Sequence, residues 1–519
     1  MAEEHWQQAR LIPTSGISGP EEAERRATSA LLAVITAVRE FGAAVIRPLG
    51  APAGAIEAFI EVPFKLGDAT VYPDGVIQTT RGGHAWTLLV EVKTGTMQLR
   101  KEQIEAYLEV ARENNYAGVL TISNAIAPEP GVHPVAIDKR KLRKASLWHL
   151  SWAEVLTIAV QQRVFRGVSD PDQAWILEEL IRYLEHPKSG ALDFADMGPT
   201  WVPVREAVAA GTLRSTDKGV DEVVTHWEQL LRFAALRLAR ELGADVGVLL
   251  TRKELSDPAI RHAALVESLC QEHSLYGQLR IADAAAPLNV LADLSGGRIS
   301  VSIDVSAPKD GRATTRVNWL TRQLHDAPDG LRVEAFATGS RTSTSKLLKE
   351  VREDPSALIE EPQRELRLFR IAATTPMGAK RNAGRGGFID SVLTSIDGFY
   401  GAVVQQVRPW AAKAPQLPKG AQLAAEQAGI DVTPPPGDVA EREDSDHETA
   451  QELEIDIEND VEPFTAEPAG AEVVSWAQAE QRLERERLHT DPGSTVDDSE
   501  DEHEAVVGAE TAPVDDGSE

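Results

Sequence analysis

Two acidic residues and a lysine stand in a pattern that could do chemistry. Asp74 follows Pro73, and Glu91 and Lys93 lie in the apolar run from Leu89 to Lys93. Side chains two residues apart in a strand share a face, so Glu91 and Lys93 are expected to project together. Asp74 stands 17 residues before Glu91 and could meet it across a hairpin-type pairing. The sequence therefore predicts two carboxylates and one ammonium group in one place.

This combination suits the hydrolysis of a phosphodiester bond. A hard divalent cation such as Mg²⁺ takes oxygen ligands from one or two carboxylates, from water and from the substrate phosphate. The bound cation neutralises phosphate charge and activates a water molecule. A lysine beside it can orient or deprotonate that water, or stabilise the developing charge. The simpler alternatives are that Asp74 is a turn residue before Gly75, and that Glu91 and Lys93 form a charge pair on an edge strand.

The elements that would position these residues follow from the hydrophobic pattern. Residues 20–45 are expected to form an amphipathic helix, with Pro20 at its start and Leu31, Ile35 and Val38 at helical spacing. Strand-like segments follow at 43–46, 58–64, 70–78 and 87–92. Residues 101–114 are typical of a helix, and 118–123 of a buried strand. This order predicts an α/β arrangement.

The motifs Pro73-Asp74 and Glu91-Val92-Lys93 resemble those of the PD-(D/E)xK nuclease superfamily, and the order of elements is similar to its restriction-endonuclease-like core. In many members, the helix after E-x-K carries Q-x-x-x-Y. Gln103 and Tyr107 stand at that spacing, which places both on one helical face. The alternative for this pair is an ordinary helix surface. The resemblance covers roughly residues 20–160.

The first helix of that superfamily often supplies another acidic residue. Glu24 shares a face with the apolar residues of the expected helix 20–45 and is directed toward the sheet. Glu57 and Glu61 compete for the same role.

The resemblance implies a metal-dependent nuclease that hydrolyses phosphodiester bonds, most often in DNA. Asp74, Glu91 and Val92 would bind Mg²⁺ or Mn²⁺, and Lys93 would assist the attacking water. A role in restriction of foreign DNA or in repair is inherited from the superfamily. A fold does not guarantee an activity. The alternative is a catalytically silent, nuclease-like scaffold that binds nucleic acid or protein.

A run of basic residues follows the expected sheet and could contact phosphates beside the cleft; it consists of Lys139, Arg140, Lys141, Arg143 and Lys144. The alternative is a solvated segment. Three arginines near residues 312–322 and three basic residues in the glycine-rich stretch 379–387 are interpreted as surface charge. His84, His133 and His149 show no spacing typical of metal ligands, and a structural or surface role is expected for them.

Four regions are expected along the chain: a nuclease-like domain at 1–165, a helical linker at 166–245, an α+β domain at 246–410 and a disordered acidic tail at 411–519. The linker would carry helices beginning near Asp170 and spanning 220–242, the second ending at Gly243. The α+β domain would carry strands at 288–294, 298–305, 331–337 and 365–372, with helices at 314–325 and 388–407.

The net charge of −28 belongs almost entirely to the tail. Residues 431–519 contain 29 acidic and 4 basic residues, a net charge of −25, which leaves 52 acidic and 49 basic residues elsewhere. Such a composition indicates disorder. A short segment at 473–488 could be a docking helix for a protein partner. A further hypothesis is that the tail mimics DNA and occupies the basic run at low salt.

The remaining features concern the compartment. The chain has one cysteine, Cys270, so no disulfide can form within it, and Cys270 is interpreted as a small buried apolar residue. No apolar run is long enough to cross a membrane, and the N-terminus does not resemble a secretory signal. These features favour a cytoplasmic protein. The oligomeric state is left open.

Overall fold

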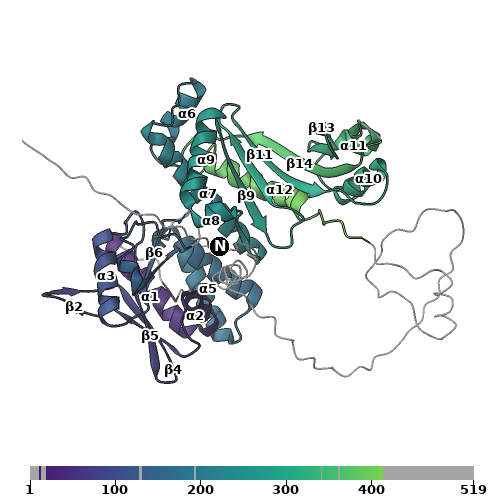
Figure 1. Ribbon diagram of the computed structural model, residues 1–519. Coiled ribbons are helices and arrows are strands. Elements are labelled where there is room, and N and C mark those ends of the chain that lie inside the picture. The colour runs from purple at the N-terminus through teal and green to yellow at the C-terminus, as the bar shows by residue number, and fades with distance from the viewer. Residues whose placement is uncertain are drawn as a thin grey trace, which may run out of the picture. The chain divides into compact units, whose positions relative to one another are not determined.

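The computed structural model describes residues 11–12, 19–127, 131–191, 194–340, 342–360 and 363–412 (Figure 1). Within these ranges the chain is mixed α/β, and its buried residues gather around two main sheets. The expected acidic tail lies outside the described residues from 413 onward, as does the segment at 473–488.

The first sheet has five strands in the order β1-β4-β5-β6-β7. The strands β1, β4 and β5 pair antiparallel, and β5, β6 and β7 pair parallel. Their bounds are Ile56–Ile60, Gly75–Arg81, His84–Val92, Gly118–Ser123 and Ser146–Ser151, in the same order. A separate two-stranded sheet is formed by β2 (Phe64–Leu66) and β3 (Ala69–Val71), and β2 projects from the five-stranded sheet in Figure 1.

Helices cover both faces of this sheet. One face packs against four helices, namely α1 (Pro20–Ala37), α2 (Arg39–Ile46), α4 (Trp152–Val160) and α5 (Pro171–Leu184). The other face packs against α3 (Lys101–Glu113). Val90 and Val92 belong to the first core and Leu89 to the second, so side chains alternate along β5 as a strand requires. Glu91, two residues after Leu89, shares the face covered by α3.

The single helix expected at 20–45 is wrong, because the chain bends between α1 and α2. Val38 has an extended backbone (φ −102°, ψ 97°), and the chain is bent by 109° between α1 and the segment Arg39–Leu49. Gly42 lets α2 approach α1 closely, since a Cβ atom there would lie 2.1 Å from the carbonyl oxygen of Ile35. The strand expected at 43–46 is therefore the end of α2.

Two further expectations about strands need correction. The strand expected at 70–78 is divided into the end of β3 and the start of β4, with Pro73 between them. Proline has no N–H to donate to a sheet, which favours a break there. The strand β7 was not predicted. The expected helix at 101–114 and strand at 118–123 are confirmed by α3 and β6.

The second main sheet has seven antiparallel strands in the order β13-β12-β14-β11-β10-β9-β8. In that order, their bounds are Ser343–Leu347, Arg332–Ala337, Leu366–Pro376, Arg298–Ser306, Leu288–Asp293, Ser274–Ile281 and Val246–Val248. Buried and less buried residues alternate along β9, β10 and β11, because helices cover one face of these strands. The four expected strands of this region are confirmed, whereas β8, β9 and β13 were not predicted.

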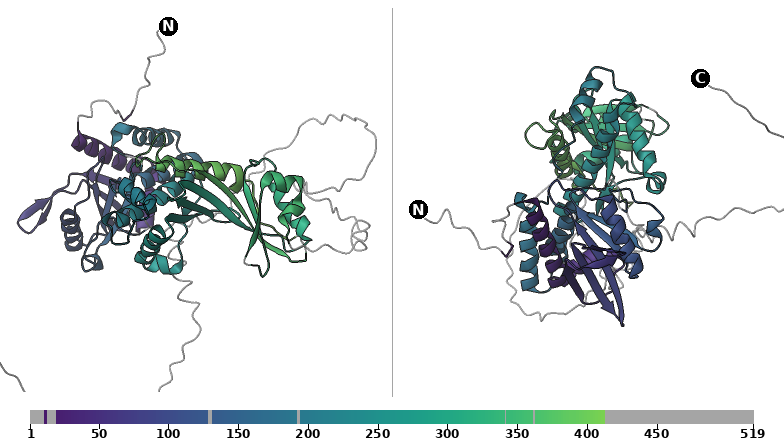
Figure 2. Two further views of the ribbon diagram at one scale, coloured as in Figure 1. Left: turned by 90° about the horizontal axis from the view of Figure 1, so that it is seen from above. Right: turned by 90° about the vertical axis from the view of Figure 1, so that its left-hand side faces the viewer.

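Helices of the second core follow the same logic of burying one apolar face. They are α6 (Trp201–Ala209), α7 (Lys218–Leu242), α9 (Pro258–Gln271), α10 (Ala313–Gln323), α11 (Leu348–Glu353) and α12 (Phe388–Phe399). The short helix α8 (Arg252–Ser256) buries none of its residues. The expected end of α7 is confirmed, since Gly243 is left-handed with φ 65°. Figure 2 shows the sheets and helices from two further directions.

Residues 166–245, expected to be a helical linker, are divided between the two cores. The helix α5 packs in the first core, whereas α6 and α7 pack in the second. The helix α4 contacts α7 directly: Glu154 Oε1 lies 3.0 Å from Arg232 Nη2, and Thr157 Oγ1 donates to the carbonyl of Leu236 at 3.2 Å.

No single described helix is long and apolar enough to cross a membrane; α1 and the segment Arg39–Leu49 reach that length only as a pair bent by 109°.

Candidate active site

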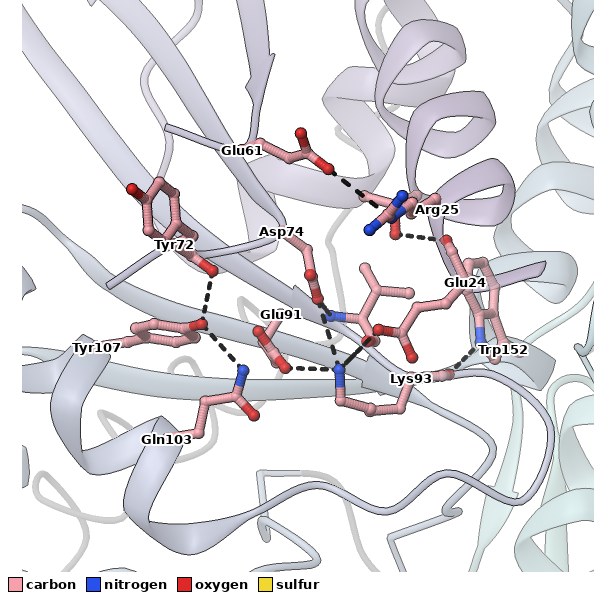
Figure 3. A network of polar contacts seen from close by, with 12 residues as sticks. Glu24, Arg25, Glu61, Tyr72, Asp74, Glu91, Lys93, Gln103, Tyr107 and Trp152 are labelled. Carbon is pink, nitrogen blue, oxygen red and sulfur yellow. Dashed lines mark hydrogen bonds and ion pairs between the residues drawn. The ribbon is translucent and has the colours of Figure 1, made fainter. Parts of the chain in front are cut away.

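The strand β5 carries Glu91 next to its end, and Lys93 follows one residue beyond that end. Gly75, the first residue of β4, pairs with Val90, which places Asp74 opposite Glu91 in the antiparallel register. Asp74 Oδ2 accepts a hydrogen bond from the backbone N–H of Val92 at 2.8 Å. The structure therefore brings Asp74, Glu91 and Lys93 together, as the spacing predicts (Figure 3).

The ammonium group of Lys93 is the centre of this arrangement. Lys93 Nζ lies 2.7 Å from Glu91 Oε1, 2.9 Å from Glu24 Oε1 and 3.8 Å from Asp74 Oδ2. Lys93 Nζ also donates to the carbonyl of Val92 at 2.9 Å. Three carboxylates and one carbonyl thus surround a single cation.

The acidic residue from the first helix is Glu24. Its position on α1 and its contact with Lys93 agree with the prediction made from its helical face. The competing residues lie elsewhere: Glu57 is exposed on β1, and Glu61 is exposed and forms a long ion pair of 3.9 Å with Arg25. Only Glu24 among the three contacts Lys93 in the described part of the chain.

Burial makes the ionised form of Glu91 unfavourable. The side chain is 1 % exposed, and neither of its carboxylate oxygens has a hydrogen-bond partner among the described residues. Oε1 nevertheless forms the close ion pair with Lys93, without hydrogen-bond geometry. Desolvation and the nearby carboxylate of Asp74 raise the pKa of Glu91 to about 8, although Lys93 opposes this shift. A cation bound next to Glu91 would therefore stabilise the ionised form of this carboxyl group.

The other two charged groups respond to the same surroundings. Burial also raises the pKa of Glu24, against the lowering effect of Lys93. Burial alone would lower the pKa of Lys93, but Glu91 and Glu24 outweigh it, so the pKa of Lys93 is raised. Lys93 is thus held as an ammonium ion.

The backbone of Lys93 is held as firmly as its side chain. Its N–H donates to the carbonyl of Ile122 on β6 at 2.7 Å, and its carbonyl accepts from Trp152 Nε1 at 2.9 Å. The next turn is closed by Gly190, whose carbonyl accepts from the N–H of Gly95 at 2.8 Å and from Asn124 Nδ2 at 2.8 Å. No sequence motif pointed to Trp152.

The helix α3 brings Gln103 and Tyr107 to the same side of the sheet. Gln103 Nε2 donates to Tyr107 Oη at 3.0 Å, and Tyr107 Oη donates to the carbonyl of Tyr72 at 2.8 Å. Burial and the negative charge of Glu91 raise the pKa of Tyr107, so the phenol stays protonated. These contacts hold the backbone at Tyr72, two residues before Asp74. The contact between Gln103 and Tyr107 agrees with the prediction that both lie on one helical face.

A second polar cluster lies beside the carboxylates and was not expected from the sequence. Thr121 on β6 is in register with Glu91 on one side and with His149 on the other. Thr121 Oγ1 lies 2.8 Å from His133 Nε2 and 2.9 Å from His149 Nδ1. Burial lowers the pKa of His133 to about 4 and also lowers the pKa of His149. Both rings are thus neutral at pH 7.

These histidines have the structural role that their isolated positions suggested. His149 Nε2 lies 2.8 Å from the carbonyl of Ala125, and the N–H of Val135 donates to His133 Nδ1 at 3.0 Å. The cluster ties the segment after β6 to the sheet. His84, the third histidine considered, is the first residue of β5.

The basic run lies beside α3. Lys141 Nζ forms an ion pair with Glu105 Oε2 at 3.0 Å, and residues 141–143 form a short 3₁₀ helix that contacts α3. The other four members are exposed, namely Lys139, Arg140, Arg143 and Lys144. Their charges are therefore available on the same side of the sheet as Gln103 and Tyr107.

One of the other basic residues, Arg316, is not the surface residue that the sequence predicted. Arg316 is 5 % exposed and donates to the carbonyls of Lys309, Gly311 and Leu366, so it has a structural role.

The donor set fits a hard divalent cation. Among the described residues, no three His, Cys, Asp or Glu side chains are arranged to hold a metal ion together. Mg²⁺ requires fewer, because it keeps several waters and takes one or two carboxylates plus phosphate oxygens. Asp74 and Glu91 supply such carboxylates, and the unpartnered Oε2 of Glu91 is a buried oxygen that a cation would satisfy.

The chain was compared with protein-family models and with curated proteins. Neither comparison gave a match.

Proposed function

We propose that this protein is a metal-dependent nuclease that hydrolyses phosphodiester bonds in DNA. The observation that carries the proposal is the convergence of Glu24, Asp74 and Glu91 on Lys93 Nζ at the end of β5. Glu91 is buried and Glu24 and Asp74 are partly buried around one lysine, which is unfavourable for folding alone. The raised pKa values of Glu91, Glu24 and Lys93 are typical of functional sites.

The order of elements supports the finer fold that we propose, a restriction-endonuclease-like core. A helix is followed by antiparallel strands, by the strand that carries Glu91, by the helix α3 and by the parallel strand β6. The positions of Gln103 and Tyr107 on α3 agree with the same core. The core extends beyond residue 160, because α5 packs in it.

The roles follow from the contacts. Asp74, Glu91 and the carbonyl of Val92 would hold Mg²⁺ or Mn²⁺, which supplies charge neutralisation and water activation when it is bound. Lys93 presents an ammonium group next to these ligands and would orient the attacking water or stabilise charge on the phosphate. The exposed basic residues at 139–144 would contact the nucleic-acid backbone.

The test is cleavage of linear, circular and single-stranded DNA in Mg²⁺ or Mn²⁺ by the wild type and by Lys93→Ala. We expect the substitution to reduce the rate by about 10²-fold or more, as for loss of a charge-stabilising donor. The matched control is Lys101→Ala, which removes an exposed lysine from α3 and leaves the site intact. A wild type that leaves every DNA form intact would refute the proposal.

A second candidate function is a silent, nuclease-like scaffold that binds nucleic acid or protein. The observation that favours it is that Lys93 already occupies the centre of the carboxylates, where it neutralises part of their charge. This candidate predicts DNA binding that does not change in Glu91→Gln and does not depend on Mg²⁺. Metal-dependent binding that is lost in Glu91→Gln would contradict it.

A further inference from the structure

We propose that Trp152 is a positioning residue for Lys93, and this inference rests on the proposed nuclease function. Trp152 is the first residue of α4 and is 1 % exposed. Its indole N–H donates to the backbone carbonyl of Lys93 at 2.9 Å (Figure 3). Trp152 contacts no reacting group, so it acts through the lysine.

Lys93 needs such an anchor because the sheet no longer holds it on both sides. The strand β5 ends at Val92, and Gly95 turns the chain with a left-handed φ of 59°. The N–H of Lys93 still donates to Ile122 on β6, but its carbonyl is satisfied by the indole of Trp152. Without this donor, a buried carbonyl would lose its partner next to the reacting side chain.

The helix that carries Trp152 is held by a capping box at its start and by an ion pair with α7. Ser151 and Glu154 form a capping box at the start of the helix, in which each side chain accepts from the other residue's backbone N–H. Glu154 also pairs with Arg232 of α7 at 3.0 Å. The indole therefore belongs to a rigid helix that the second core supports.

The consequence for catalysis is geometric. Lys93 Nζ lies within 2.9 Å of two carboxylate oxygens, and a shift of its backbone would move the ammonium group away from the position that these contacts define. A misplacement of about 1 Å can reduce a rate by about 10²-fold. Such a misplacement would lower kcat and leave substrate binding unchanged.

The experiment compares Trp152→Phe with Trp227→Phe. Trp227 is a matched control, because it is fully buried in the second core and its indole also donates to a carbonyl, that of Tyr276, at 2.9 Å. We expect kcat for DNA cleavage to fall at least about tenfold in Trp152→Phe, with KM within about twofold. We expect Trp227→Phe to keep its kcat. A fall in kcat no larger than in the control would overturn the proposal.

Two further measurements distinguish a failure of the anchoring role from a failure of the proposed nuclease function. Replacing Trp152 with benzothienylalanine keeps the ring shape and removes only the N–H donor, so it applies even if Trp152→Phe does not fold. Hydrogen exchange of the peptide covering residues 89–97 should become faster in that variant, and unchanged exchange would overturn the anchoring role. An inert wild type would refute the nuclease, while hydrogen exchange would still decide whether Trp152 anchors Lys93.

Discussion

The Glu91→Gln substitution is expected to stabilise the protein at alkaline pH in the absence of metal, because it removes a carboxyl group that burial makes difficult to ionise. The pKa of Glu91 is raised from 4.5 to about 8. Between these two values the folded state holds a proton that the unfolded state has released. The free energy of unfolding of the wild type therefore falls as the pH rises from about 4.5 to about 8.

The magnitude follows from the size of the pKa difference. One pKa unit corresponds to about 1.4 kcal/mol, so the wild type should lose about 3 kcal/mol of stability through Glu91 between pH 5.5 and pH 8.0. Glutamine does not titrate and nearly preserves the shape of the side chain. The Glu91→Gln protein should lack this contribution, so its advantage over the wild type should grow by up to about 3 kcal/mol across the same interval.

The assay is urea unfolding with a chelator present, followed by tryptophan fluorescence at pH 5.5 and pH 8.0. Glu154→Gln is a pH-independent control, because desolvation of Glu154 is outweighed by Arg232, which lowers the pKa of that carboxyl below its usual value. Glu154 is therefore ionised in the folded and the unfolded state at both pH values, and its loss should destabilise the protein about equally at pH 5.5 and pH 8.0. An equal effect of Glu91→Gln at both pH values would refute the reasoning. Added Mg²⁺ should stabilise the wild type and not the Glu91→Gln protein.

Three other outcomes are expected. Tyr107→Phe removes the O–H that supports the carbonyl of Tyr72, and should lower the cleavage rate about tenfold with a loss of about 1 kcal/mol of stability; an unchanged rate would exclude this support. His133 has a pKa lowered to about 4, so this residue should contribute a loss of about 1 to 2 kcal/mol of stability between pH 7 and pH 5, as the unfolded imidazole takes up a proton, on top of the opposite change due to Glu91. His133→Gln should lack that loss in urea unfolding at the two pH values. Deletion of the residues after Gln416 should tighten DNA binding at low salt if the acidic tail competes for the basic run, and an unchanged Kd would remove that hypothesis.

Local periodicity was enough to predict much of the candidate site. A strand repeats every two residues, so the common side of Glu91 and Lys93 followed from the sequence. A helix returns to the same face after four residues, which placed Gln103 with Tyr107. The same rule placed Glu24, because it shares a helical face with buried apolar residues.

The contacts between distant segments could not be predicted in this way. Thr121, His133 and His149 meet only because two parallel strands and a loop bring them together, and no local spacing encodes that meeting. The contact of the Trp152 indole could not be predicted either, since the pattern of a helix does not tell which carbonyl a tryptophan N–H will reach. The bend at Val38 likewise depends on the close packing of two helices rather than on a breaking residue.

The closure of the turn after Lys93 by Gly190 determines where the N-terminal unit could be cut from this chain and joined to another protein. Gly190 follows α5, and its carbonyl binds both Gly95 and Asn124. A gene fusion or a cloning boundary at residue 165 would separate this glycine from the turn that it closes, and would remove α5 from its core. The smallest fragment that keeps the turn intact therefore ends after Gly190. In such a fragment Glu154 of α4 would lose its ion pair with Arg232, so the protein to which it is joined would have to supply another basic residue.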